Sequence, residues 1–135
     1  MASFYYEQKD YKSALEYALK ARDERREYPL ELAATLDILG CIQLAEHDID
    51  AASDNMQEAL NIRRKYWKDI NPNHPDIGIS HQNLGKLNTK NSSYVDAEKH
   101  YKRAERIFRT NYPESHSLMV DITKRLRDIG QRLGN

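Results

Sequence analysis

The chain has 135 residues, which is enough for one ordinary domain with its own hydrophobic core. Its 21 lysines and arginines are balanced by 21 aspartates and glutamates, and a zero formal charge argues against general binding to nucleic acid or to an anionic membrane. The sequence has only five glycines and four prolines and no apolar run long enough to cross a bilayer, so its composition favours helices in a protein that does not span a membrane.

The first predicted element is a partial helical repeat over residues 1–28. The segment KDYKSALEYALKARDE at 9–24 carries alanines seven residues apart, Ala14 and Ala21, with Tyr11 three residues before the first. Met1 and the small residue Ala2 fall where the middle of a preceding helix should lie, so we expect the chain to be a fragment of a larger repeat protein. Phe4, Tyr5 and Tyr6 would then leave apolar surface uncovered, which usually indicates a contact.

The second predicted element, residues 29–70, is a complete pair of helices. Its first helix starts at Pro29 and carries Gly40 after an apolar residue, and the segment HDIDAASDNMQEALNI at 47–62 again has alanines seven residues apart, Ala52 and Ala59. The helices break at Glu46-His47-Asp48, where helix-forming residues give way to polar ones.

The third element, residues 71–111, repeats the second at a fixed offset of 45 residues, so Gly85, Ala97 and Ala104 stand where Gly40, Ala52 and Ala59 stood. It begins with a connector, Asn71–Pro75, whose prolines are poorly tolerated inside a helix. Residues 112–135 form the last predicted helix. Its apolar face and opposite charged face are what a capping helix needs, with one side packed and one in water.

Small residues at fixed positions let two antiparallel helices approach closely, and apolar residues at steps of three and four fill the seam between them. One such pair cannot bury its own apolar face, so the pairs must stack. The sequence therefore predicts an all-α fold, an α-solenoid of stacked antiparallel helix pairs in a single domain that ends in a C-terminal capping helix.

This pattern resembles the tetratricopeptide repeat, which has a small residue in its first helix, an aromatic residue near the turn and two alanines in its second helix. The resemblance extends to the kinesin-light-chain type of repeat through Ile62-Arg63, His74-Pro75 and Asn83-Leu84-Gly85. The sequence departs from that type at Gln82-Asn83, in place of an asparagine pair, and at Asp37-Ile38. The family implies binding to another protein rather than catalysis.

No residues assemble an enzyme site. The five histidines lack the spacing of a helical zinc site, so we expect surface, capping or groove histidines and no metal or cofactor. Cys41 has no activating neighbour in sequence, and none of the isolated glycines forms a phosphate-binding loop. Because a single cysteine cannot form an internal disulfide, the chain fits a reducing compartment, and we expect a cytoplasmic protein that is not an enzyme.

The resemblance implies that the first helix of each pair lines a concave face. The residues that we expect there, as a partner-binding surface, are Ala34, Asp37, Ile38, Cys41, Gln82, Asn83, Lys86, Lys90, Lys124 and Arg127. Amide side chains can bind an extended backbone, cations can pair with carboxylates, and small residues leave room for a bulky side chain. We therefore predict a scaffold or adaptor that binds a peptide with an apolar anchor and flanking acids.

Two other functions remain open. The chain could assemble with itself as a homodimer, either through its open first repeat or because its acidic middle meets the basic end of a second copy. Residues 31–60 hold seven acids and no lysine or arginine, whereas residues 98–132 hold nine bases and five acids. The chain could also be the regulatory domain of a larger enzyme whose catalytic part lies outside these residues.

Overall fold

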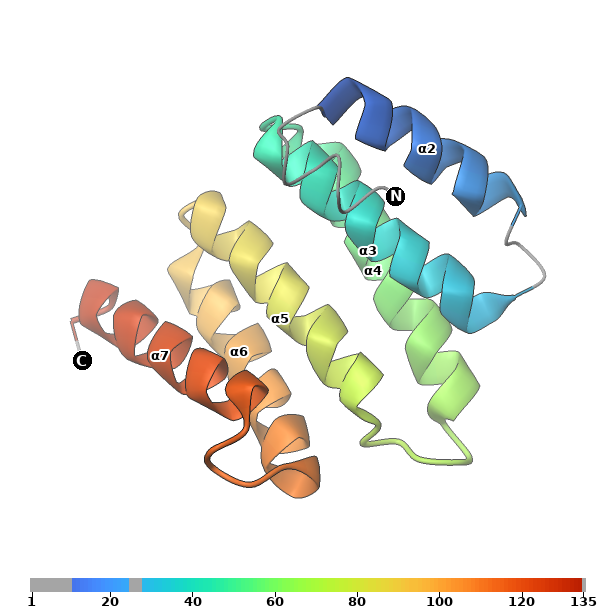
Figure 1. Ribbon diagram of the computed structural model, residues 1–135. Coiled ribbons are helices and arrows are strands. Elements are labelled where there is room, and N and C mark those ends of the chain that lie inside the picture. The colour runs from blue at the N-terminus through green and yellow to red at the C-terminus, as the bar shows by residue number, and fades with distance from the viewer. Residues whose placement is uncertain (1–10, 25–27, 135) are drawn as a thin grey trace. The chain divides into compact units, whose positions relative to one another are not determined.

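The computed structural model describes residues 11–24 and 28–134, and all the regular structure in these ranges is helical (Figure 1). The helices are α2 (Tyr11–Glu24), α3 (Pro29–Ala45), α4 (Ile49–Trp67), α5 (Pro75–Lys90), α6 (Tyr94–Asn111) and α7 (Ser117–Arg132). The prediction of an all-α protein is therefore confirmed. Several residues used in the sequence argument lie outside the described part, namely Met1, Ala2, Phe4, Tyr5, Tyr6 and the side chains of Tyr11 and Ala14.

The chain divides into two compact parts, unit 1 (Met1–Tyr66) and unit 2 (Trp67–Asn135). The expected assignment of residues 1–28, 29–70, 71–111 and 112–135 to successive repeats and a cap within one domain stays a prediction. Among the described residues, no helix combines the length and the apolar character that a membrane span requires.

In unit 1, α3 is packed on two sides, which explains why its sequence is apolar almost all round. Leu39 and Ile42 join Ala18 of α2 in one buried cluster. Ala33 and Leu36 join Ala59 of α4 in another cluster. Each fully buried leucine or isoleucine in these clusters contributes roughly 1.5–3 kcal/mol to folding.

Glycines mark points where helices come close, and the repeat pattern predicts this for Gly40 and Gly85. A Cβ atom added to Gly40 of α3 would lie 2.8 Å from Cγ of Met56 on α4. In unit 2, a Cβ on Gly78 of α5 would lie 2.6 Å from a ring carbon of Phe108 on α6. Gly85 lies just as tightly against the ring of Tyr101. Only a residue without a side chain allows these approaches.

The last helix, α7, closes unit 2 by packing on α6. Met119, Ile122 and Ile129 are its buried residues. They belong to the apolar face that the sequence predicts, while Lys124 and Arg127 on the same helix are exposed. One side of α7 is therefore packed and the other is in solvent.

The turns inside the two complete pairs share one geometry. His47 and Ser92, which are 45 residues apart, both adopt left-handed backbone conformations, with φ of 64° and 60°. In each turn the next amide N–H reaches back to the final turn of the preceding helix. The N–H of Asp48 donates to the carbonyl of Gln43, and that of Ser93 donates to the carbonyl of Asn88. Both helices therefore end in a Schellman motif, with an ordinary residue where glycine is usual.

Two histidines begin helices. Nδ1 of His74 accepts a hydrogen bond from the N–H of Asp76 at 3.0 Å, and Nδ1 of His116 accepts one from the N–H of Leu118 at 3.1 Å. Each imidazole also stacks on an aromatic ring. The ring centroids lie 3.8 Å apart for Trp67 and His74, and 3.9 Å apart for the ring of Tyr112 and His116. Capping was one of the roles expected for the histidines, and these two perform it.

Candidate partner-binding surface

The four residues expected to bind a partner from unit 1 lie on α3 in different surroundings. Ala34 is exposed, Ile38 and Cys41 are half-buried, and Asp37 is buried. Ile38 also packs against the cluster that joins α3 to α2. The exposed part of this surface is therefore narrow and carries mainly small or apolar groups.

Asp37 forms an ion pair with Arg63 of α4 inside unit 1. The Arg63 side chain is 7% exposed and that of Asp37 is 10% exposed, so both charges are largely removed from water. A buried carboxylate needs such a cation, because leaving either charge without its partner in the interior is costly. Asp37 therefore joins α3 to α4. In the sequence, Arg63 is recognisable only as part of a repeat motif.

In unit 2, Gln82 and Asn83 of α5 are buried, with 6% and 8% of their surfaces exposed. The Gln82 amide donates a 2.6 Å hydrogen bond to the Asp121 carboxylate of α7. The same oxygen of Asp121 accepts a 2.8 Å hydrogen bond from Nε of Arg125. Gln82 thus joins α5 to α7, a contact that no sequence pattern predicts.

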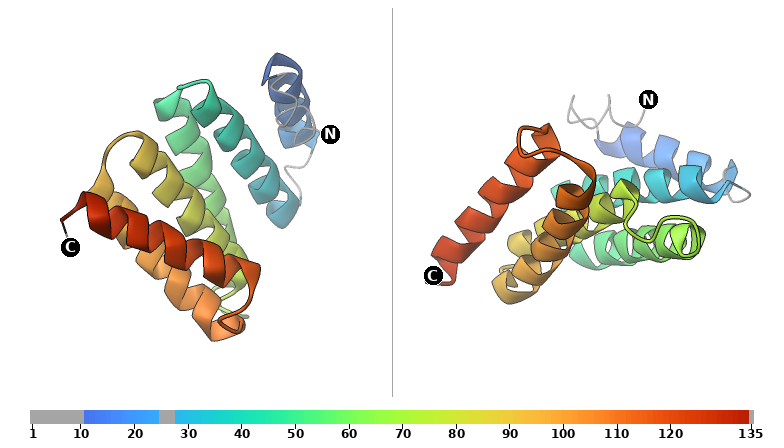
Figure 2. Two further views of the ribbon diagram at one scale, coloured as in Figure 1. Left: turned by 60° about the vertical axis from the view of Figure 1, so that its left-hand side comes forward. Right: turned by 90° about the horizontal axis from the view of Figure 1, so that it is seen from below.

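The four expected cations of unit 2 are accessible. Lys86 is half-buried, while Lys90, Lys124 and Arg127 are exposed. Lys86 follows Gln82 by one turn of α5, and Lys124 follows Asp121 by about one turn of α7. Because Gln82 bonds to Asp121 and the two helices run in the same direction (Figures 1 and 2), Lys86 and Lys124 each follow that hydrogen bond by about one helical turn.

These cations are available for an external anion. Among the described residues, none of Lys86, Lys90, Lys124 and Arg127 forms an ion pair. Nearby, Asp121 is already engaged. Burial alone would lower the pKa of Arg125, but the hydrogen bond to Asp121 and the charge of that carboxylate raise it above its ordinary value. We call Lys86, Lys90, Lys124 and Arg127 the cationic surface.

A histidine pair that the sequence did not reveal joins α5 to α6. The Nδ1 atoms of His81 and His100 lie 3.0 Å apart, so one ring donates a hydrogen bond and the other accepts it. Burial and the charge of Arg103 lower the pKa of His100, and Asp96 partly opposes them. A pocket of about 330 Å³ beside the pair is lined by Asn88, Asp96, Lys99, His100 and Arg103. The two histidines are 19 residues apart on different helices, so no short motif marks them.

In the part of the chain that the structure describes, no three histidine, cysteine, aspartate or glutamate side chains are grouped so that they could hold a metal ion. The surfaces described above offer cations that can pair with carboxylates, and small or apolar residues that can contact apolar side chains.

Comparison with known proteins agrees with the helical fold described above. Residues 1–65 match the family model for the tetratricopeptide repeat. None of the curated proteins matches the chain. Among solved structures 27 chains match, and one is the crystal structure of the apo form of RapI, with a TM-score of 0.85 and 21% sequence identity.

The alignment with RapI covers 99% of this chain but 47% of that one, so the chain spans about half the length of RapI. At this level of identity the likeness shows the fold alone, which is an all-α solenoid of stacked antiparallel helix pairs. The family match over residues 1–65 and the fold of the described chain together support a tetratricopeptide-repeat protein.

Proposed function

We propose that the chain is a non-catalytic scaffold or adaptor that binds a partner peptide with an apolar anchor and flanking acidic residues. Tetratricopeptide repeats in general support a protein-interaction module. The observation that carries the finer proposal is the cationic surface, where four cations on two helices running in the same direction have no acidic partner among the described residues. Carboxylates of an extended peptide would pair with these cations.

Three small or apolar residues of α3 support a place for the apolar anchor. Ala34 and Cys41 have short side chains, and Ile38 adds apolar surface between them on the same face of the helix. Asp37 and Gln82 have a supporting role in this proposal. Asp37 bonds to Arg63 within unit 1, and Gln82 bonds to Asp121 within unit 2, so each holds in place the helix that carries the contact residues. We place the module in the cytoplasm because its one cysteine, Cys41, fits a reducing compartment.

We also propose that the repeats are of the kinesin-light-chain type. Residues of all three motifs that suggested this have structural roles: Arg63 pairs with Asp37, His74 caps α5 ahead of Pro75, and Gly85 admits the ring of Tyr101. A type of repeat defined by these motifs should use them in the same roles. Kinesin-light-chain repeats of known structure that lacked the histidine cap and the close contact between the glycine and an aromatic ring would contradict the assignment.

Selection from a random peptide-display library tests the main proposal, with the whole chain beside a Lys86→Glu/Lys90→Glu variant. The matched control is Lys102→Glu/Arg106→Glu, which makes the same charge change at the same spacing on α6. We expect a recurring apolar and acidic motif that binds the unchanged chain and the control but not the Lys86/Lys90 variant. Peptides indifferent to the reversal, or no recurring motif, would reject the cationic surface as the binding site.

A further inference from the structure

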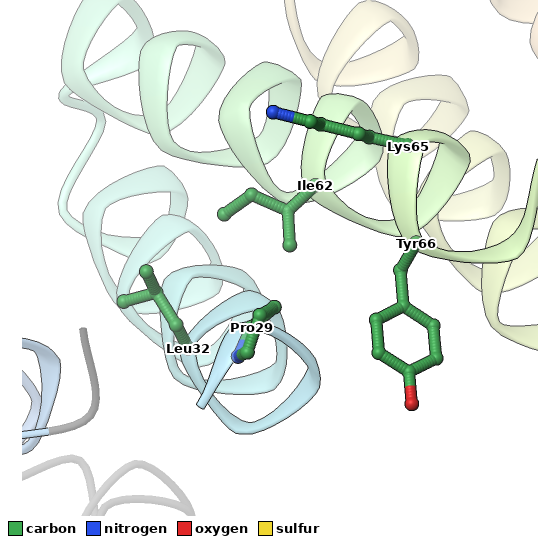
Figure 3. A pocket seen from close by; sticks show the side chains of 5 residues that line it. All are labelled: Pro29, Leu32, Ile62, Lys65 and Tyr66. Atoms are coloured by element: carbon green, nitrogen blue, oxygen red, sulfur yellow. The ribbon is translucent and has the colours of Figure 1, made fainter. Parts of the chain in front are cut away.

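A pocket in unit 1, separate from the cationic surface, lies between the beginning of α3 and the end of α4. It has a volume of about 410 Å³ and is lined by Pro29, Leu32, Ile62, Lys65 and Tyr66. Figure 3 shows Pro29 and Leu32 of α3 facing Ile62 of α4, with the ring of Tyr66 at one edge. The lining side chains offer carbon atoms except at the Lys65 ammonium and the Tyr66 hydroxyl.

The internal repeat shows that this apolar surface is closed in unit 2. Leu32 and Ile62 correspond, at the 45-residue offset, to Ile77 and Ile107, which are 5% and 8% exposed. A Cβ on Gly78 would lie only 3.1 Å from Ile107, so the start of α5 packs directly on the end of α6. In unit 1 the corresponding Leu32 and Ile62 are only partly buried.

The residue at the edge differs between the units. In unit 2, the Asn111 amide donates 2.8 Å hydrogen bonds to the carbonyls of Asn73 and Ile107, which fasten the connector across the end of α6. The corresponding residue of unit 1 is Tyr66, whose side chain cannot make that pair of bonds and is 43% exposed. An apolar site that the repeat closes in unit 2 therefore stays open in unit 1.

The charge at the rim indicates which partner would fit. The last turn of α4 carries Arg64 and Lys65, both exposed. Among the described residues Lys65 forms no ion pair. A ligand whose apolar group fills the space over Leu32 and Ile62 would bring a carboxylate attached to it close to the Lys65 ammonium.

We propose that this pocket binds a segment of a partner protein in which a large apolar side chain stands next to an aspartate or glutamate. The apolar side chain packs on Pro29, Leu32 and Ile62, and the carboxylate pairs with Lys65. Tyr66 covers one edge with its ring, and tyrosine is common at interfaces because it combines an apolar ring with a polar hydroxyl. The site belongs to unit 1 alone and does not depend on the cationic surface of unit 2.

A small probe with both groups is 3-phenylpropionate, and its amide, 3-phenylpropionamide, is the uncharged match. We would titrate each into the whole chain and follow the methyl NMR signals of Leu32 and Ile62. Saturable shifts at both residues are expected, with tighter binding of the acid. Lys65→Gln should weaken the acid about twofold to fivefold, the size of an exposed ion pair, and leave the amide unchanged. Lys20→Gln on α2 is the matched control, because Lys20 is another exposed lysine of unit 1.

A second variant, Ile62→Trp, would fill the pocket and should abolish the shifts at Leu32 while the circular dichroism stays helical. No saturable shift, or equal binding of acid and amide, overturns the proposal. If the chain is a dimer by light scattering and Ile62→Trp makes it monomeric, the occupant is a second copy, which also overturns it. Lys86→Glu/Lys90→Glu should leave the titration unchanged, so failure of this site and failure of the cationic surface are separate results.

Discussion

Asp37 of α3 and Arg63 of α4 form an ion pair that is buried between the two helices of unit 1. Neither helix supplies this pair alone, since the residues stand 26 positions apart in the chain. It is a buried charged contact between α3 and α4, which are also joined by the hydrogen bond that the Asn55 amide donates to Gln43. Two free energies can be measured for this pair: the stability lost when one charge is left unpaired, and the stability lost when both charges are removed.

Replacing only Arg63 should be strongly destabilising. Arg63→Met leaves the Asp37 carboxylate without its cation in the interior, and we expect a loss of about 3 kcal/mol in the free energy of unfolding. The double variant Asp37→Leu/Arg63→Met removes both charges and should recover to within about 1 kcal/mol of the unchanged chain. Urea unfolding followed by circular dichroism measures both. A double variant as unstable as the single one would show that the pair itself supplies the stability.

The stability of unit 2 should fall as the pH is lowered through the ordinary histidine pKa of 6.5, because burial and Arg103 lower the pKa of His100 in the folded chain. Between the two pKa values the unfolded chain binds the additional proton, so the stabilisation is complete above 6.5 and decreases below it. Protonation of both rings would also place two donors at the 3.0 Å contact with His81.

Unfolding midpoints in urea between pH 8 and pH 5 test this dependence. His100→Asn should flatten the slope in this range, while His47→Asn, at an exposed turn, should preserve it. The same slope in all three proteins would assign the pH dependence to other groups.

Glycine at position 92 should make the folded chain more stable than serine does. With φ of 60°, Ser92 occupies a conformation that is strained for residues with a Cβ atom. We expect Ser92→Gly to stabilise the chain by about 0.5–1 kcal/mol and Ser92→Val to destabilise it by about 1–2 kcal/mol. The adjacent Ser93→Gly, at φ of −92°, is the control and should stabilise nothing. Denaturation of the three variants measures the differences, and equal effects at 92 and 93 would rule out backbone strain.

Adding one methyl group at Gly85 should separate α5 from α6. Alanine would gain about 1 kcal/mol of helix propensity, but its Cβ would collide with the buried ring of Tyr101. We expect the collision to win, with a net loss of about 1–3 kcal/mol for Gly85→Ala, measured as unfolding free energy. In a Tyr101→Leu background the same change should cost much less, because the smaller side chain leaves room. Equal cost in both backgrounds would refute the close approach.

The repeat pattern predicted the helices, the turns and the close crossings, because each depends on residues near one another or at a fixed spacing. Gly40 and Gly85 lie at crossings, and Pro75 begins α5. The repeat pattern could not predict which residues each polar side chain contacts. Asp37 and Gln82 occupy corresponding positions, yet one pairs with α4 and the other with α7, since their partners Arg63 and Asp121 lie far along the chain.

The candidate sites likewise combine features that the sequence predicts with features that only the structure shows. Lys90, Lys124 and Arg127 are exposed, as expected of lysines and arginines on the polar faces of helices. The pocket over Leu32 and Ile62 was not predicted, because those residues follow the same apolar pattern as their closed counterparts Ile77 and Ile107. Only the three-dimensional packing distinguishes the open site from the closed one.

The stacked ring of Trp67 also gives the chain an internal optical signal. Trp67 is the only tryptophan, and its indole lies flat against the imidazole that caps α5, with the ring planes 7° apart. Any event that lifts His74 from the start of α5 changes the surroundings of the single indole emitter. Intrinsic fluorescence, without an added label, therefore reports whether that cap is closed.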